Sequence, residues 1–154
     1  KFNKKIPDYF LIKGADCWGW GTWRRAWRKF EKDGLKLKKI IDKKNLKKEF
    51  NFNNSYDYYQ MLKDQIANKN DSWAIRWYAT AFLNNMFTLY PTKSLVKNIG
   101  DDGTGTHGSG RRNVNSKLIS YKKFIPIDIR KINNKENIKA RKQIEFYLKD
   151  KIKR

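Results

Sequence analysis

Short unbroken runs of apolar residues predict several strands along the chain. Residues 9–12, Tyr-Phe-Leu-Ile, follow Pro7 and form a continuous apolar stretch of the length that is typical of a buried strand. Residues 87–90, 95–99 and 118–125 have a similar character. We therefore expect the strands of this protein to be short.

Elsewhere the apolar residues recur every three or four positions, which is the period of an amphipathic helix. The first such stripe begins at Trp23, with Thr22 as its expected N-cap and Gly34 as its expected end. Ser55 is expected to cap a later helix. The expected helices span residues 22–33, 35–48, 55–66, 72–84 and 135–152.

About five helices and a few short strands place the chain in the α/β class, as a helix-rich fragment with α+β character. No repeat is visible, and no linker divides the chain clearly. We expect a body over residues 1–125 and a basic C-terminal helix or tail over residues 126–154. The apolar stripe of this tail is thin, so the tail either docks weakly or waits for a partner.

The composition is that of one globular domain. The chain has 154 residues, of which 39% are hydrophobic, and a domain of this size buries about 70% of the surface that its unfolded chain exposes. No run approaches the roughly 20 apolar residues of a membrane-spanning helix. Cys17 is the only cysteine, which excludes an internal disulfide and a Cys-rich zinc site. A lone cysteine fits a reducing compartment, and we expect a cytoplasmic protein.

The charge is strongly positive. Thirty-six Lys and Arg residues against 15 Asp and Glu give a net charge of +21. Such a charge favours a polyanionic partner, which could be nucleic acid, an anionic membrane leaflet or a phosphorylated small molecule. A solvated lysine-rich surface explains the same number equally well, because charge alone does not identify a partner.

Residues 13–27, KGADCWGWGTWRRAW, form the first candidate site. The glycines allow tight turns, and Trp18 and Trp20 project to the same side if the segment is extended. Flat apolar rings of this kind stack on sugars or on bases. Core packing is the alternative, and we prefer it for Trp23 and Trp27, which lie on the helical stripe.

Asp71 is the second candidate, because it precedes the helix expected over residues 72–84. A carboxylate at a helix N-terminus is ionised at neutral pH, as a general base must be. Capping is the commoner use of Asp in this position, and Asn70 or Ser72 could equally be the cap. Trp73 in the first turn would supply part of an aromatic platform for a sugar.

The third candidate is the glycine-rich stretch 100–112, GDDGTGTHGSGRR. It lacks the order of a Walker loop, but exposed backbone amides followed by Arg111 and Arg112 suit a diphosphate. His107 is the only histidine, which excludes a site built from several histidines. It could still complete a carboxylate-rich metal site.

Three strings, taken together, resemble a known family. YFLIKGADCWGWGTWRRAWRKFE, NDSWAIRWYATAFLNN and LYPTKSLVKNIGDDGTGTHG, in this order and at these distances, are similar to the C-terminal half of bacterial glycosyltransferases of family 2 with the GT-A fold. The resemblance covers about residues 6–108. It implies inverting transfer of a sugar from a nucleotide-sugar donor to a hydroxyl of a glycan or lipid-linked acceptor, in the synthesis of surface polysaccharide.

The resemblance also assigns roles to residues. Asp71 stands where such enzymes have their catalytic base. The segment from Gly14, Ala15 and Asp16 to Trp18 and Trp20 resembles the strand and turn that line the donor and acceptor pocket. His107 stands where some relatives have a ligand to Mn²⁺ or Mg²⁺, and this role is carried over only weakly.

One departure from the family is important. The chain contains no Asp-x-Asp triplet and no preceding run of alternating strands and helices. The nucleotide and most of the metal site are therefore expected to come from a missing N-terminal half, and we expect this chain alone to be inactive. Its basic surface would suit attachment to the inner face of the cell membrane. A nucleic-acid-binding module is a less favoured alternative, because most aromatics fall on helical stripes, and an inactive scaffold is another.

Overall fold

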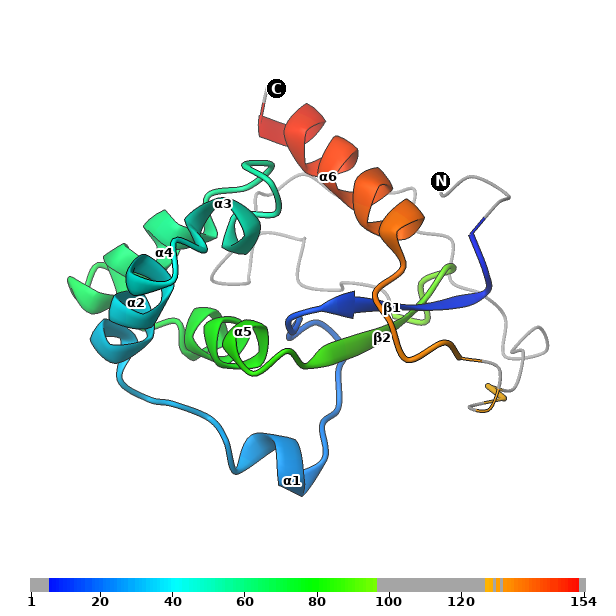
Figure 1. The fold of residues 1–154 in the computed structure, drawn as a ribbon, viewed down its shortest axis with the longest axis horizontal. Coiled ribbons are helices and arrows are strands. Elements are labelled where there is room, and N and C mark those ends of the chain that lie inside the picture. The colour runs from blue at the N-terminus through cyan, green and yellow to red at the C-terminus, as the bar shows by residue number, and fades with distance from the viewer. Residues whose placement is uncertain (1–5, 97–126, 129, 131, 153–154) are drawn as a thin grey trace.

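The chain folds into a helix-rich domain of mixed class around a small sheet (Figure 1). The structure is a computed structural model, and it describes residues 6–96, 127–128, 130 and 132–152. The elements are β1 (Tyr9–Lys13), α1 (Arg24–Trp27), α2 (Gly34–Lys43), α3 (Lys47–Phe50), α4 (Tyr58–Ile66), α5 (Trp73–Leu83), β2 (Phe87–Pro91) and α6 (Ile138–Ile152). The predicted helix-rich mixed class is confirmed at this level.

The two strands of the sheet lie side by side although they are far apart in the sequence, with α1 to α5 between them in the chain. β1 and β2 are antiparallel, and Tyr9 lies opposite Pro91 while Lys13 lies opposite Phe87. Phe10 and Ile12 point into the core, and the residues between them are only half-buried. The strand predicted at 9–12 and that predicted at 87–90 are therefore both confirmed. Pro91 fits because it ends its strand, where a missing amide costs no ladder bond.

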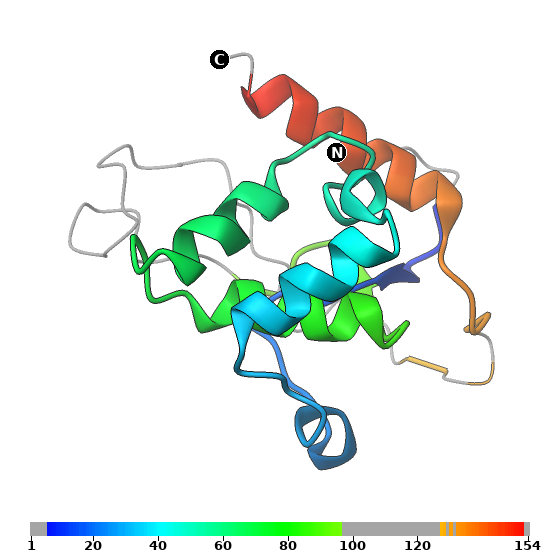
Figure 2. The same ribbon diagram turned by 60° about the vertical axis from the view of Figure 1, so that its left-hand side comes forward.

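The core lies between the sheet and the layer formed by α2, α4 and α5 (Figures 1 and 2). α5 is the central helix, since seven of its eleven residues are buried. Such a helix is apolar on most sides because neighbours cover most of its surface. The fully buried large apolar side chains are those of Ile41, Phe50, Leu62 and Phe82.

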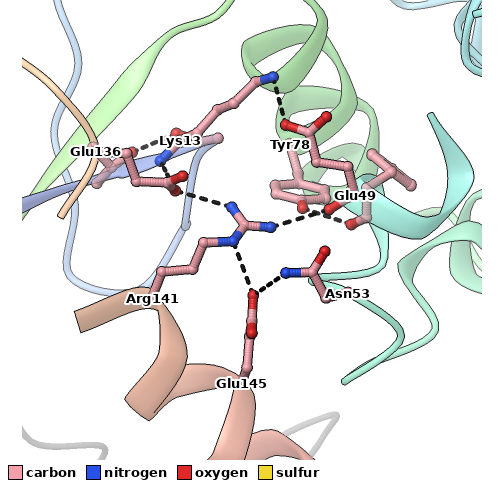
Figure 3. A network of polar contacts seen from close by, with 10 residues as sticks. Lys13, Glu49, Asn53, Tyr78, Glu136, Arg141 and Glu145 are labelled. Carbon is pink, nitrogen blue, oxygen red and sulfur yellow. Dashed lines mark hydrogen bonds and ion pairs between the residues drawn. The ribbon is translucent and has the colours of Figure 1, made fainter. Parts of the chain in front are cut away.

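α6 is fastened to this body by a buried guanidinium (Figure 3). The Arg141 side chain is 7% exposed and forms ion pairs with Glu136 at 2.9 Å and Glu145 at 3.0 Å. It also donates to the backbone carbonyl of Glu49 and lies over the Phe52 ring. All three nitrogens of the guanidinium thus have acceptors and one of its faces is covered by a ring, as burial of a charge requires.

The remaining contacts of α6 are apolar. Ala140 is fully buried, and Ile144 and Leu148 pack against the core. The helix begins near its predicted position, and Asn137 caps it by accepting from the amide of Ala140. The thin apolar stripe is therefore supplemented by a polar clamp, which the sequence pattern did not indicate.

The helix predicted over 22–33 is wrong for most of its length. α1 has four residues, its N-cap position is Trp23, and no side chain caps it. Gly34 does not end this helix but begins α2, where Asp33 is the cap and accepts from the amide of Lys36. A Cβ on Gly34 would lie 2.5 Å from Gln65 Oε1 and 3.1 Å from Ile66 Cγ1, so α2 approaches α4 closely at this residue.

Two other boundaries also differ from prediction. The helix expected over 35–48 is interrupted where Asn45 adopts a positive φ of 53°, and α3 starts afterwards. Asp57 caps α4 by accepting from the amide of Gln60, whereas Ser55 is buried before it. Asn, Asp and Ser side chains compete for helix caps and turns by forming local hydrogen bonds with the backbone. Helix propensity alone does not predict which of them takes the position. The helix predicted over 72–84 is confirmed as α5, with Ser72 as its cap.

The strand expected over 95–99 is not formed by Leu95 and Val96. Its other residues, the strand expected over 118–125 and the glycine-rich stretch 100–112 lie outside the described residues. Over the described part of the chain, no helix has both the length and the apolar character needed to cross a bilayer.

Replacing Arg141 by Ala should lower the free energy of unfolding by about 3–5 kcal/mol, because two half-buried carboxylates lose their cation. Urea denaturation followed by circular dichroism measures this change. Lys139→Ala, at an exposed position of the same helix, is the control and should change stability by less than about 0.5 kcal/mol. Equal effects of the two substitutions would contradict the clamp.

Candidate functional site

A broad hollow lies between the segment that follows β1 and the helix α5. Residues 14–26 form one side of it, and residues of β2, α5 and α6 form the others. Its volume is about 1860 Å³, larger than the roughly 300–1,000 Å³ of most small-molecule pockets. The hollow is therefore a wide surface depression that could hold a long ligand or another polypeptide segment.

Gly14 positions the first side of this hollow against α5. The residue has φ of +106°, and a Cβ placed on it would lie 2.6 Å from Cε2 of Tyr78. Its amide donates to the carbonyl of Met86, and its carbonyl accepts from the Thr88 hydroxyl. The chain can turn out of the strand here only because glycine has no side chain to meet the Tyr78 ring.

The Tyr78 ring is itself fixed in place. Its hydroxyl donates to the backbone carbonyl of Phe50 at 2.7 Å, and the ring packs on Phe50 and Tyr58 at centroid distances of 4.9 and 4.6 Å. Burial raises the pKa of Tyr78 well above its usual value, so the phenol stays protonated and keeps this bond. The wall of the hollow is consequently rigid at this point.

Trp20 lies at the centre of an aromatic cluster that joins the glycine-punctuated segment to α5. Its ring is 5.7 Å from that of Trp73 and 6.2 Å from that of Trp77, both on α5, and 6.1 Å from Trp27. Trp77 is buried, whereas Trp73 is 42% exposed. The first and second candidate stretches of the sequence are therefore in direct contact through these rings.

Trp18 points differently from Trp20. It lines the hollow and remains 62% exposed, and its amide donates to Asp16 Oδ1 at 3.2 Å. Gly19, with φ of +50°, separates the two tryptophans and faces Val96. The expectation that Trp18 is available to a ligand fits this exposure, while Trp20 is partly used for packing.

Asp16 brings a carboxylate to the hollow, and Ala15 lies beside it in the same wall. Burial, and then the charge of Asp16, raise the pKa of the Cys17 thiol to about 11 and that of the Tyr58 phenol to about 12. The pKa of Tyr90 is raised for the same two reasons. At neutral pH the Cys17 thiol and the Tyr58 and Tyr90 phenols therefore stay protonated. Asp16 and Asp150 both line the hollow.

Asp71 lies outside the hollow. It is exposed and is not among the residues of the wall, although the next residue, Ser72, is. The question of the cap is settled in favour of Ser72, whose hydroxyl accepts from the amide of Ile75. Asn70 accepts from the amide of Ser72 in turn. Asp71 therefore does not cap the helix. The residue is exposed to solvent.

The structure thus brings together most of the predicted residues. Gly14, Ala15, Asp16, Trp18 and Trp20 share one wall, and Trp73 contacts Trp20. His107, Arg111 and Arg112 lie outside the described residues. Within residues 6–96 and the described parts of 127–152, no group of three or more His, Cys, Asp and Glu side chains could hold a metal ion.

Sequence reasoning missed the tyrosines of the hollow. Tyr58 and Tyr90 both line it, next to Tyr78. Tyr58 lies in the helix expected over residues 55–66 and Tyr90 in the strand expected over residues 87–90, and neither pattern indicates a chemical role. A tyrosine with one apolar face and one polar tip fits either role, and only the fold places their hydroxyls near Asp16.

No family model matches the chain, and neither a curated protein nor a solved structure matches it.

Replacing Gly14 by Ala should lower the free energy of unfolding by about 2–4 kcal/mol, because the new methyl adds both backbone strain and a clash with Tyr78. Chemical denaturation measures this loss. Gly21→Ala is a matched control in the same segment, since nothing lies within 4 Å of a Cβ placed there. A tolerated Gly14→Ala would show that the segment does not depend on this contact.

Proposed function

We propose that this chain forms the acceptor side of an inverting glycosyltransferase of the GT-A type, and that its hollow binds a glycan or lipid-linked acceptor. The observation that carries the proposal is the meeting of two separate stretches that resemble the family. Residues 14–20 and the N-terminal half of α5 form one hollow, and Trp20 and Trp73 join them at 5.7 Å. The fold could have placed these two stretches on opposite faces of the domain.

The chemistry of the wall suits a sugar. Trp18 presents an exposed ring, on which the apolar C–H face of a pyranose can stack. Asp16 supplies two acceptor oxygens for sugar hydroxyls, and the Tyr58 and Tyr90 phenols supply protonated partners. A flat apolar platform next to a few convergent polar groups is the usual composition of a ligand site.

In this proposal Asp71 is the general base. It removes the proton from an acceptor hydroxyl, the oxygen attacks the anomeric carbon of the donor sugar, and the nucleoside diphosphate leaves. Asp71 is exposed and lies outside the hollow, next to the wall residue Ser72, so the acceptor would have to extend beyond the hollow to reach it. Asp16, in the wall, would orient the acceptor. A bound Mn²⁺ or Mg²⁺ would offset the charge of the diphosphate.

A catalytically inactive basic scaffold is the second candidate, and it is favoured by one observation. Asp71 is exposed and stands outside the wall of the hollow, whereas a base is expected to point at the reacting hydroxyl. A nucleic-acid-binding module is a variant of this candidate, because the net charge is +21. Both variants predict that the hollow has no sugar ligand.

Trp18→Ala should weaken binding of the chain to a glycan by at least about tenfold, since loss of a central aromatic contact costs about 2 kcal/mol or more. A glycan array with the labelled chain identifies the ligand, and titration calorimetry then compares the variants. Leu35→Ala, at another exposed apolar residue away from the hollow, should leave the affinity unchanged. Absence of any glycan ligand, together with a gel shift at physiological salt, would favour nucleic-acid binding.

Asp71→Asn should lower turnover by at least about a hundredfold with little change in melting temperature, because base catalysis contributes about 10²- to 10⁴-fold. The assay uses the smallest protein containing this chain that transfers sugar. Asp16→Asn should mainly raise KM, since Asp16 orients the acceptor. The reverse result, with turnover lost only in Asp16→Asn, would move the base to Asp16.

A further inference from the structure

The segment around α1 extends away from the rest of the domain. In Figures 1 and 2 this one-turn helix lies at the tip of an excursion between β1 and α2, apart from the other helices. None of the four residues of α1 is buried. The tip is therefore a projection: Trp23 and Arg25 lie at the rim of the hollow, whereas Arg24, Arg28 and Lys29 do not line it.

Exposed tryptophan rings mark this projection. Trp23 is 64% exposed and Trp27 is 41% exposed. The sequence predicted both to pack in the core, but only Trp27 packs, on Phe30 and on the cluster around Trp20. Neighbouring exposed aromatic rings bordered by polar side chains are typical of a surface that contacts a membrane or another molecule.

Cationic side chains surround these rings. Arg24, Arg25, Arg28 and Lys29 are exposed, and among the described residues none of them forms an ion pair. Arg25 lies over the Trp23 ring at 5.0 Å. Glu31, the nearest carboxylate in sequence, is already paired with Lys36. The projection therefore presents uncompensated positive charge immediately beside exposed aromatic rings.

We infer that this projection, consisting of residues 23–29, is a docking surface for an anionic lipid bilayer. Tryptophan favours the headgroup level of a bilayer because one end of its ring system is apolar and the other donates a hydrogen bond. Arginine and lysine next to it are attracted by anionic headgroups. Arg24, Arg28 and Lys29 lie outside the hollow, which favours a membrane over single-stranded nucleic acid, because such a strand is usually held along a charged groove.

The inference does not rest on sugar transfer, because an inactive scaffold could dock in the same way. The inference does, however, position the hollow relative to the bilayer. Trp23 and Arg25 belong both to the projection and to the rim of the hollow, so docking through them would place that rim at the surface of the bilayer.

Vesicle flotation of the whole chain tests this inference. The probes are vesicles of phosphatidylcholine alone and of an equimolar mixture of phosphatidylcholine and phosphatidylglycerol. We expect binding only to the mixed vesicles. The double substitution Arg24→Gln and Arg28→Gln should weaken it by about 25-fold, because each cation near such a surface contributes about fivefold.

Two further variants separate local docking from general charge attraction. Lys39→Gln with Lys43→Gln removes the same charge from exposed positions of α2 and should weaken binding by less than about fivefold. Trp23→Ala should weaken it by about tenfold or more, through loss of apolar burial. Melting temperatures show that each variant folds.

Three results would overturn the inference. These are equal recovery with both vesicle types, an equal loss in the α2 control, and a Trp23→Ala variant that binds like the unsubstituted chain. A gel shift with single-stranded DNA at physiological salt, lost in the Arg24 and Arg28 variant while vesicles are not bound, would assign the projection to nucleic acid instead.

Discussion

The contact between the backbone of Gly14 and the ring of Tyr78 determines how the rest of the domain is arranged. The Tyr78 hydroxyl is bound to the carbonyl of Phe50, so the ring cannot withdraw. Gly14 adopts φ of +106° against this ring, and the chain leaves β1 directly over α5. The wall of the hollow and the aromatic cluster follow from this turn. A side chain at this position would separate the segment from the helix.

The second anchor is electrostatic and lies close to the first, because Figure 3 shows Tyr78 beside the polar network of Arg141. Arg141 holds α6 through Glu136, Glu145 and the carbonyl of Glu49 (Figure 3). Lys13 extends the same network, because its amide donates to Glu136 and its ammonium to Glu49. A buried guanidinium with complete partners adds little net stability compared with apolar packing, but it strongly penalises any other placement of the helix. The C-terminal helix therefore has one defined position above the sheet.

The two candidate surfaces differ in character and share an edge. The hollow combines aromatic rings and protonated phenols with side chains of both charges, including Asp16, Asp150 and Lys13, which suits the hydroxyl groups of a sugar. The projection of residues 23–29 combines rings with uncompensated cations, which is a composition for an anionic surface. Trp23 and Arg25 belong to both. An acceptor that is anchored in a bilayer would meet both surfaces together, and this geometry links the two proposals.

The sequence by itself determined the local elements with strong periodicity or continuous apolar runs. These are β1, β2, α5 and α6, because each depends on near neighbours in the chain. The cap of α5 stayed open among Asn70, Asp71 and Ser72 until the structure showed Ser72 in that role. The sequence pattern failed over residues 22–33, where the period was helical but only part of the stripe is covered, because Trp27 and Phe30 pack on Trp77 while Trp23 stays exposed. Helical stability comes mostly from such packing. Only the tertiary structure decided which candidate side chains meet. It joined Trp20 to Trp73, brought the Tyr58 and Tyr90 phenols to Asp16, buried Arg141 and left Asp71 in solvent. Contacts of this kind join residues far apart in the chain, and no local pattern encodes them.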